Sequence, residues 1–385
     1  METAEKIVKE LIQLANIEIP GDLEVHHPDF YARILRDGPL GFGESYMEGW
    51  WDTKSLDKLF DKINRSNIGY KIKKNKRFLL KIALSKILNF QTQKRAWTVG
   101  KKHYDLGTDL FQKMLDSHMN YTCGYWQNAK NLEEAQLAKL ELTCQKLLLK
   151  PGMRLLDIGC GFGGLAKYAA EHYGVEVVGV TISKEQQAHA KKVCEGLPIQ
   201  IRLQDYRDMK EKFDRIVSLG MFEHVGFLNY KIYMQTVHRC LKNDGVFLLH
   251  TIGNTFAEYP NEWITKYIFP NGMLPSIALI AKASEKFFVM EDWHNFGADY
   301  DKTLMAWHKN FEANWPLLTS KYDEKFYRMW NYYLLSCAGT FRARAMHLWQ
   351  IVFTKEGMIG GYKAPREVEI RRSIASNCLI ESSAG

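Results

Sequence analysis

The sequence predicts an α/β protein with a doubly wound parallel sheet, preceded by a smaller, mainly helical unit. Two observations lead to this prediction. Apolar strand-like runs alternate with helical patterns, the runs at 154–158, 175–181, 199–204, 213–219 and 245–252 and the helices near 163–173, 184–195 and 228–241. A glycine-rich turn also follows the first strand and opens a helix. Two later strands, 287–296 and 347–354, flank a helical stretch and predict an antiparallel pair at the sheet edge.

The chain divides into three predicted parts. Residues 1–95 form the helical unit, 96–357 the catalytic domain, and 358–385 a loosely held tail rich in glycine, serine and charge. Within the first unit, residues 70–90 carry seven basic residues and no acidic one, with apolar residues at helical spacing. This pattern fits a helix on an anionic bilayer surface, and it equally fits a docked helix with a solvated lysine face.

Composition limits the classes of partner and compartment. The 385 residues suffice for a large and a small domain, and the net charge of +8 favours anionic partners, either nucleic acid or a membrane surface. The seven cysteines show no CxxC pair and no zinc spacing, which indicates reduced thiols in the cytoplasm. No secretory signal opens the chain and no apolar run reaches the roughly 18 residues of a membrane span. We therefore expect any membrane contact to come from the water side.

The turn after the first strand places four glycines within six positions, in the order Asp157-Ile158-Gly159-Cys160-Gly161-Phe162-Gly163-Gly164. An NAD site would need an acidic residue at the end of the second strand, which instead ends Thr181-Ile182-Ser183. A P-loop would need Lys-Ser/Thr after the turn, and Leu165 follows Gly164. S-adenosylmethionine is the best remaining ligand. A tight turn that binds no nucleotide is the alternative.

Ligands of such sheets bind beyond the carboxyl ends of the strands. The first strand brings Asp157 and the turn, whose candidate cofactor contacts are Gly159, Cys160, Gly161 and Gly163. The second brings Thr181, Ile182, Ser183 and Gln186, whose polar groups can bind ribose hydroxyls. The third brings Gln204, Asp205 and Tyr206, suited to the adenine amino group and to stacking.

The fourth and fifth strands bring Glu223 and His250 to neighbouring strand ends. Either residue alone could be structural, as a helix cap or a satisfied core histidine. Together they favour a catalytic pair near the reacting end of the cofactor. No third residue has metal-site spacing, so we predict no metal.

Cys123 and Cys337 are considered apart from Cys160 of the glycine turn, because a catalytic role has to be weighed for each. Free cysteines usually act as small buried hydrophobes. A nucleophilic role would need a lowered thiol pKa, which sequence does not show. For Cys337 the structural role is the better prediction.

Several segments, taken in order, resemble a known family. They are His103-Tyr104-Asp105-Leu106-Gly107, Tyr121-Thr122-Cys123-Gly124-Tyr125-Trp126, the glycine turn, Gly179-Val180-Thr181-Ile182-Ser183, Gln204-Asp205-Tyr206-Arg207-Asp208, Phe222-Glu223-His224-Val225-Gly226, Leu249-His250-Thr251-Ile252-Gly253 and Asn295-Phe296-Gly297-Ala298-Asp299-Tyr300. They resemble the bacterial cyclopropane-fatty-acyl-phospholipid synthases, relatives of the mycolic-acid cyclopropane synthases, over about residues 24–354.

The resemblance implies a class I S-adenosylmethionine-dependent methyltransferase fold. It also implies methyl transfer to a cis double bond of a phospholipid acyl chain, followed by ring closure with an active-site bicarbonate as base. The bicarbonate ligands carried over are Cys123, Glu223, His250, the backbone of Ile252, and Tyr300. The cofactor contacts carried over are Tyr121, Thr122, the glycine turn, 181–186 and 204–206.

Two positions depart from the family's pattern, and one further cysteine matches it. Thr122 replaces the family's usual serine and Phe162 its usual tryptophan, and both keep the local chemistry. Cys337 matches a cysteine once considered a catalytic nucleophile in the family.

The expected partner is a phospholipid bilayer surface with unsaturated acyl chains, not a nucleic acid, at the inner face of the cell membrane. We also expect a homodimer. The alternatives are a methyltransferase acting on nucleic acid or a soluble small molecule, and a non-catalytic membrane-binding protein. A closed apolar tunnel would argue against the first, and S-adenosylmethionine binding against the second.

Overall fold

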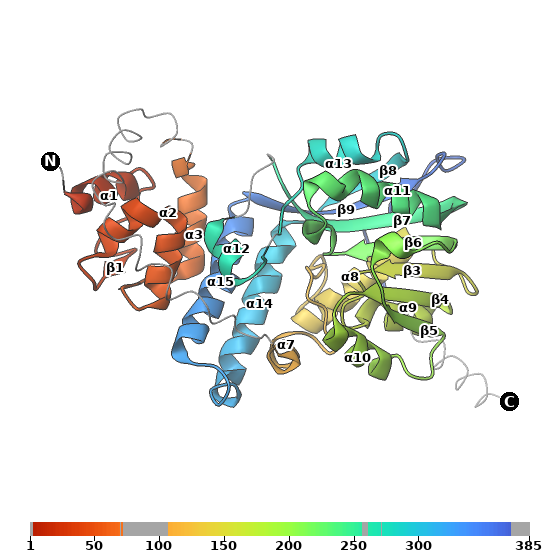
Figure 1. The fold of residues 1–385 in the computed structure, drawn as a ribbon, viewed down its shortest axis with the longest axis horizontal. Helices are drawn as coiled ribbons and strands as arrows, with labels where there is room; N and C mark the ends of the chain where they lie inside the picture. Colours follow the sequence, from red (N-terminus) through yellow and green to blue (C-terminus); the bar gives the residue numbers. More distant parts are fainter. Residues whose placement is uncertain (1–2, 70, 72–106, 256–260, 271, 371–385) are drawn as a thin grey trace. The chain divides into compact units, whose positions relative to one another are not determined.

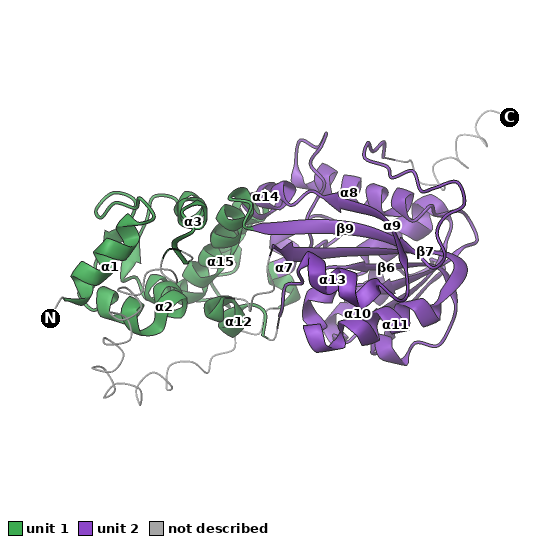
Figure 2. Ribbon diagram, turned by 90° about the horizontal axis from the view of Figure 1, so that it is seen from above, with its two compact units in different colours: residues 1–110, 259–271, 307–345 green, residues 111–258, 272–306, 346–385 purple. Residues whose placement is uncertain are grey.

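The computed structural model describes residues 3–69, 71, 107–255, 261–270 and 272–370. The basic segment predicted at 70–90 lies almost wholly outside these residues, as does the start of the predicted catalytic domain. The chain forms two compact units (Figures 1 and 2). One contains 1–110, 259–271 and 307–345, and the other, which we call the catalytic unit, contains 111–258, 272–306 and 346–385.

A seven-stranded sheet forms the centre of the catalytic unit, in the order β5-β4-β3-β6-β7-β9-β8. The first five of these strands are parallel, and β9 and β8 are antiparallel to their neighbours. The predicted doubly wound sheet with an antiparallel edge is confirmed. The strand bounds are β3 Arg154–Ile158, β4 Glu176–Thr181, β5 Ile199–Leu203, β6 Phe213–Leu219, β7 Leu241–Asn254, β8 Val289–Asn295 and β9 Met346–Thr354.

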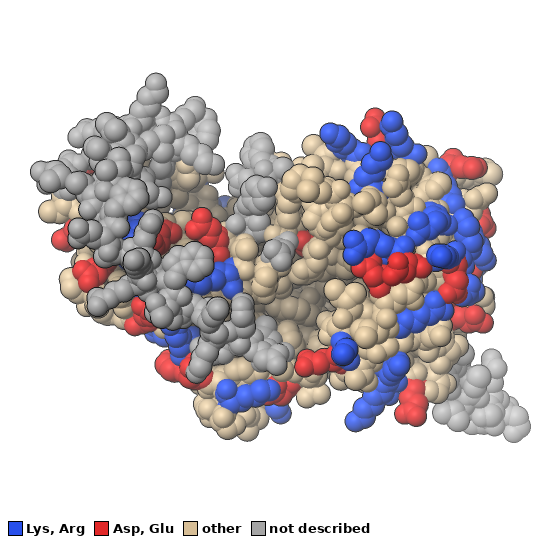
Figure 3. Space-filling view, viewed as in Figure 1, with Lys and Arg blue, Asp and Glu red and all other residues tan. Residues whose placement is uncertain are grey.

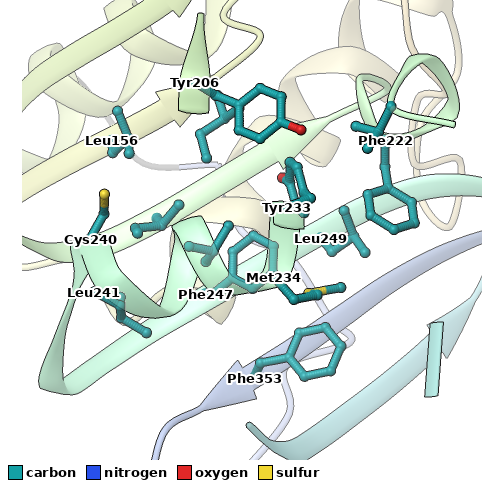
Figure 4. Close-up of a cluster of buried hydrophobic side chains, with 14 of the residues drawn as sticks. Leu156, Tyr206, Phe222, Tyr233, Met234, Cys240, Leu241, Phe247, Leu249 and Phe353 are labelled. Carbon is teal, nitrogen blue, oxygen red and sulfur yellow. The ribbon is translucent and has the colours of Figure 1, made fainter. Parts of the chain in front are cut away.

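Helices cover both faces of this sheet (Figure 1). Apolar residues of α8 (Leu132–Lys146) and α9 (Gly164–Tyr173) form one core with the sheet, and α10 (Lys184–Val193) packs beside β4 and β5. The opposite core, shown in part in Figure 4, holds α11 (Tyr230–Cys240) and α13 (Ile277–Ser284). Burial on both faces explains why the central strands are nearly continuous apolar runs. The remaining short elements are α7 Thr108–Met114, η2 Tyr206–Asp208, η3 Phe222–His224 and η4 Phe227–Asn229.

The other unit is helical, as predicted, but its composition differs from the predicted 1–95. Its own segments are α1 Ala4–Gln13, β1 Glu24–Val25, α2 Phe30–Met47 (kinked at Gly38), β2 Trp51–Asp52 and α3 Leu56–Arg65. They are joined by α12 (Glu262–Tyr267), η5 (Trp315–Leu317), α15 (Glu324–Arg342) and the end of α14 (Ala298–Asn314). Close packing explains this grouping. A Cβ on Gly339 would lie 2.2 Å from the Asp57 carbonyl oxygen, and one on Gly43 2.4 Å from the Trp263 ring.

The C-terminal segment also differs from the predicted loose tail, as far as residue 370. The Tyr362 hydroxyl donates to the Lys146 carbonyl at 2.8 Å, and the Tyr125 hydroxyl donates to the Arg366 carbonyl at 2.7 Å. Arg366 also makes a bidentate contact with Asp292, at 2.6 and 3.0 Å. Specific polar contacts therefore hold 358–370 against the rest of the catalytic unit. Residues 371–385 lie outside the described part of the chain.

Among the helices that the structure describes, none combines the length and apolar character needed to cross a membrane.

Candidate active site

The glycine turn has the geometry predicted for close approach of a ligand. Gly159, Gly161 and Gly163 all have positive φ, of 81°, 53° and 89°. The Gly159 and Cys160 N–H groups donate to the Val180 carbonyl, at 2.9 and 3.1 Å, which ties the turn to the end of β4. A Cβ on Gly161 would meet no atom within 4 Å, so this glycine faces open space. The turn can therefore present backbone to a cofactor at Gly161.

The residues at the end of β4 are organised by their own hydrogen bonds. The Thr181 hydroxyl donates to the Gln186 side-chain carbonyl at 2.8 Å and accepts from the Ser183 N–H at 3.2 Å. Ser183 caps α10 by accepting from the Gln186 N–H. Ile182 between them is exposed. These bonds orient the Gln186 amide, and the predicted ribose contact stays a prediction.

The residues after β5 fit their predicted roles less well. The Asp205 carboxylate accepts from the N–H and guanidinium of Arg207, the latter at 2.6 Å. Tyr206 is buried, with its ring 5.2 Å from that of Tyr233 in the core (Figure 4). The predicted stacking of Tyr206 on adenine therefore has no support in the geometry, because the core occupies the ring. The Gln204 N–H donates to the Thr181 carbonyl, which fixes this loop beside β4.

Three loops meet at the carboxyl edge of the sheet. A Cβ on Gly159 would lie 2.7 Å from the Cβ of Met221, and one on Gly220 would lie 2.8 Å from a Thr122 methyl carbon. The turn after β3, the loop after β6 and the segment containing Tyr121 and Thr122 are thus in contact. The structure brings these predicted cofactor residues to one place.

Glu223 is held by the sheet register. The strand β6 ends opposite His250, where the Gly220 N–H donates to the His250 carbonyl at 2.9 Å. The N–H of Ile252, two residues further along β7, donates instead to Oε1 of Glu223 at 2.7 Å. The other carboxylate oxygen, Oε2, is buried without a hydrogen-bond partner in the described structure. Burial raises the pKa of Glu223 to about 7, although the Ile252 N–H opposes this shift.

His250 lies two residues before Ile252, so the two side chains share one face of β7. Its Nδ1 is 3.3 Å from the Gln350 amide nitrogen, and its Nε2 is buried with no hydrogen-bond partner among the described residues. Burial lowers the pKa of His250 well below its usual range, and the positive charges of Lys139 and Lys146 add to the effect. The imidazole is therefore neutral at physiological pH.

The segment 121–126 and α14 converge beside His250. The Phe296 ring lies 5.9 Å from the ring of His250 and 5.3 Å from that of Tyr125. Cys123 is buried, with its thiol donating to the Gly124 carbonyl at 3.2 Å and lying 3.8 Å from the Thr303 hydroxyl. Tyr300 is buried one helical turn before Thr303, so both lie on one face of α14. Five predicted catalytic positions, namely Cys123, Glu223, His250, Ile252 and Tyr300, thus belong to the catalytic unit.

Comparison with known proteins places this geometry in a family. Residues 91–351 match the family model described as mycolic acid cyclopropane synthetase. The chain is 55% identical over 366 residues to the cyclopropane-fatty-acyl-phospholipid synthase of Escherichia coli strain K12, covering 94% of this chain and 96% of that one. The chain belongs to the cyclopropane synthase family. It is an S-adenosylmethionine-dependent methyltransferase, and the recognition made from the motifs is confirmed.

Solved structures agree with this membership. A cyclopropane synthase of Mycobacterium tuberculosis matches with a TM-score of 0.63 and 33% identity, covering 66% of this chain and 96% of that chain. A mycolic acid cyclopropane synthase complexed with SAH and CTAB matches with a TM-score of 0.61 and 35% identity, covering 66% and 97%. A coclaurine N-methyltransferase, at 21% identity and a TM-score of 0.64, shares the fold.

Cys337, the remaining catalytic candidate, lies on α15 in the helical unit, outside the unit that holds the other five. Burial raises the pKa of its thiol to about 12, and burial likewise raises the pKa of Cys123 well above its usual range. Neither cysteine is poised as a thiolate, as a family member using a cysteine nucleophile would require. The structural role predicted for Cys337 agrees with this environment.

The sequence reasoning missed a buried polar stripe on α8. Lys139 is fully buried, donates to Asn120 Oδ1 at 2.9 Å, and has its pKa lowered to about 8 by burial. Burial raises the pKa of Asp157 in β3 to about 7, and the positive charge of Lys139 opposes this shift. The signal was polar residues at helical spacing, Gln136, Lys139, Thr143 and Lys146, on a helix expected to be buried.

Within the described residues, one cluster could bring metal ligands together, formed by Asp116, His118 and Glu133. Asp116 accepts hydrogen bonds from Asn120, and Glu133 accepts from the Ser117 N–H at 2.9 Å. These bonds explain the cluster as a folded turn, and we assign it no metal.

Proposed function

We propose that this enzyme converts cis double bonds of unsaturated phospholipid acyl chains into cyclopropane rings, with S-adenosylmethionine as the carbon donor and bicarbonate as the proton acceptor. The observation that carries the proposal is a pair of buried atoms with no hydrogen-bond partner in the described part of the chain, Glu223 Oε2 and His250 Nε2. Glu223 follows the end of β6, and His250 lies in β7 opposite that end. The 55% identity to a phospholipid-acting relative over 94% of the chain supports the substrate class.

The residues fit bicarbonate by their donor and acceptor chemistry. Neutral His250 has its proton on one ring nitrogen and can donate it in a hydrogen bond. Glu223, with a pKa of about 7, can accept a hydrogen bond when ionised and donate one when protonated. Bicarbonate has both an O–H and anionic oxygens, so it matches one acceptor and one donor. Unsatisfied polar atoms in a buried site also call for a ligand, because leaving them unpaired costs about 1–3 kcal/mol each.

The residues of the chain have distinct tasks in such a reaction. An alkene is a weak nucleophile, so the turn at Gly159–Gly163 must hold the sulfonium methyl close to it and in line with it. Methyl transfer leaves a carbocation on the acyl chain, which buried aromatic rings such as Phe296 protect from water. Bound bicarbonate would supply the base that removes a proton from the new methyl group. Glu223, His250 and the Ile252 backbone then hold that proton acceptor in place.

The direct test is chemical analysis of the product. Purified protein is incubated with vesicles of a monounsaturated phospholipid and methyl-labelled S-adenosylmethionine, and the fatty acids are released and identified by mass spectrometry. We expect a labelled cyclopropane fatty acid. Label in an acyclic, methyl-branched chain would contradict the proposed product. Label that enters a water-soluble product and no lipid when cell extract is added would contradict the proposed substrate.

The proposal includes contact with the bilayer from the cytoplasmic side and assembly as a homodimer. The net charge of +8 and the lipid substrate support the first. Vesicle flotation tests binding to the bilayer, and light scattering of the purified protein tests whether it is a homodimer.

A further inference from the structure

His250 and Gln350 face each other across the antiparallel pair β7 and β9. Their Cα atoms are register partners, and only 1% and 0% of the two residues is exposed. The Gln350 amide nitrogen lies 3.3 Å from His250 Nδ1. Side chains directly opposite in a strand pair are neighbours on one face of the sheet, so the register itself builds this contact.

The direction of this hydrogen bond follows from a third residue, Thr143 on α8. The Thr143 hydroxyl donates its one hydrogen to the Lys139 carbonyl at 2.8 Å. Its oxygen must therefore accept from Gln350, whose amide nitrogen lies 3.1 Å away. The opposite amide orientation would turn the Gln350 carbonyl towards an oxygen with no hydrogen left to donate. The two hydrogens of the Gln350 amide thus go to Thr143 and to His250 Nδ1, while its Oε1 is buried with no hydrogen-bond partner among the described residues.

This direction fixes the proton on the imidazole. An Nδ1 that accepts a hydrogen bond carries no proton, so a neutral ring must carry its proton on Nε2. The groups around the ring keep it neutral. Lys139 and Lys146 from α8 lower the pKa of His250 beyond the effect of burial, and the apolar ring of Phe296 packs on it from the segment before α14.

We propose that Gln350 is a positioning residue for the reaction, holding His250 as the Nε2–H tautomer so that this N–H can donate to the proton acceptor. The proposal rests on the proposed function, which gives His250 its task. The Nδ1–H tautomer would instead turn a lone pair on Nε2 towards the ion, where it repels an anionic oxygen and can pair only with the single O–H that ionised Glu223 also accepts from. Gln350 thus decides whether His250 donates to an anionic oxygen or competes with Glu223 for that O–H.

Two variants of Gln350 and a matched control test this role. Gln350→Leu removes the donor to Nδ1, and Gln350→Glu replaces it with a carboxylate that accepts from Nδ1–H. The control is Thr354→Val, four residues along β9, which removes a part-buried hydrogen bond to Glu291 from a residue that is itself buried. Two-bond 1H–15N spectra of histidine-labelled protein report the tautomer, with the His250 signal assigned by its loss in His250→Gln. Turnover is measured on unsaturated phospholipid vesicles.

We expect the Nε2–H form in the unmodified protein, the Nδ1–H form or the imidazolium in Gln350→Glu, and a mixture of tautomers in Gln350→Leu. We expect kcat to fall by about 10- to 100-fold in both variants, the same order as the loss when a partner that orients a metal-ligating histidine is removed. KM for S-adenosylmethionine should change by less than about twofold, since the cofactor turn is untouched. Thr354→Val should keep both the spectrum and kcat.

Three results would overturn the proposal, and they differ from one another. A proton on Nδ1 in the unmodified protein, or an unchanged tautomer in both Gln350 variants, removes Gln350 as the group that sets the ring. A changed tautomer with unchanged turnover removes His250 from the proposed mechanism. Product analysis separates either failure from failure of the proposed activity. If Gln350→Leu does not fold, Gln350→Glu, which has nearly the same shape, still decides the question.

Discussion

Glu223 is a carboxyl group whose burial raises its pKa to about 7, although hydrogen bonds from the Ile252 N–H, its own N–H and the Thr251 side chain oppose this shift. Its position is set by the end of β6 opposite His250, and its Oε1 takes the N–H of Ile252 that a longer strand would have paired. The same arrangement leaves Oε2 without a hydrogen-bond partner among the residues that the structure describes. Two measurable consequences follow, one for the reaction and one for stability.

Glu223→Gln should abolish most of the turnover. The amide keeps the shape and can still accept from the Ile252 N–H, but it cannot ionise or exchange a proton. We expect cyclopropane formation to fall by about 10²- to 10⁴-fold, the usual worth of a positioned acid–base group. Calorimetry should show unchanged S-adenosylmethionine affinity. Near-normal turnover would remove Glu223 from the mechanism, and Glu176→Gln at an exposed position serves as the control.

The same substitution should stabilise the protein at alkaline pH. The unfolded chain releases the Glu223 proton near its ordinary pKa of 4.5, whereas the folded protein keeps it until about pH 7. Between these values the folded state binds more protons, so the free energy of unfolding falls as pH rises and then levels off. Gln lacks this titration. Urea unfolding should show Glu223→Gln gaining about 1–3 kcal/mol over the unmodified protein at pH 8, with little difference at pH 4.5. A constant difference across pH would contradict the buried carboxyl.

Glu223 and His250 were predictable as site residues because the sequence places both near the carboxyl ends of neighbouring strands, which meet at one edge of a parallel sheet. In the structure Glu223 follows the end of β6, and His250 lies within β7, which continues to Asn254. The contacts of Gln350 and Thr303 were not predictable from the sequence. Gln350 contacts Thr143, 207 positions away, and Thr303 contacts Cys123, 180 positions away. Such contacts depend on helix and strand packing that no local pattern encodes. Tyr206 follows β5 at the edge where the sequence predicts cofactor contacts, and its ring packs against that of Tyr233 in the core, a contact that no local pattern predicts.

At the scale of elements, the strands were predictable to within a few residues because apolar runs bounded by turns mark buried strands. The fate of 358–370 was not predictable. Its composition resembles a tail, and it is held in place by particular contacts, Tyr362 to Lys146, Arg366 to Asp292 and Arg366 to Tyr125. Lys146 is buried beside Asp292, with N···O 3.6 Å, and burial lowers its pKa to about 7. Arg366 therefore completes a half-buried charge cluster under this segment.

Arg366→Met should consequently destabilise the catalytic unit. Asp292 would lose its bidentate partner while remaining nearly buried, with 9% of its side chain exposed. Breaking a buried pair costs about 3–5 kcal/mol, and the part exposure of Arg366 reduces this to about 1–3 kcal/mol. Urea unfolding followed by tryptophan fluorescence measures the loss. Lys363→Met, an exposed position on the same segment, is the matched control. Equal stability of the two variants would show that the segment is not held through Arg366.

At the scale of the whole molecule, the two compact units divide the chain by packing and not by sequence order. Residues 259–271 and 307–345 belong with the N-terminal helices because Trp263 fills the space left by Gly43 and α15 lies against α3 at Gly339. Composition does not show that segments from late in the chain pack with the N-terminal helices. The sequence therefore predicted one boundary, near residue 95, between the helical unit and the catalytic domain. The helical character of this unit was predictable from the sequence, but the list of segments that form it was not.

Charge at this scale bears on how the enzyme reaches its lipid. On the face shown in Figure 3, basic and acidic side chains of the catalytic unit are interspersed, without one continuous basic stripe of the kind that follows a nucleic-acid backbone. The densest basic run in the sequence is instead 70–90. We therefore expect Lys73, Lys74 and Lys76, all changed to Gln, to weaken binding to vesicles containing phosphatidylglycerol. At about 1 kcal/mol per charge, the three substitutions should together weaken binding by about 100-fold at low salt.

The matched control changes the exposed residues Lys191, Lys192 and Lys210 of the catalytic unit to Gln, so that net charge falls equally in both triple variants. If 70–90 contacts the bilayer, only the first variant loses vesicle binding, and raising salt to 0.5 M removes most of the difference because exposed charges are screened. Both should keep their turnover on a lipid dispersed in detergent, where no charged surface has to be found. Equal loss in the two variants would mean that total charge, and not this segment, directs the enzyme to its substrate.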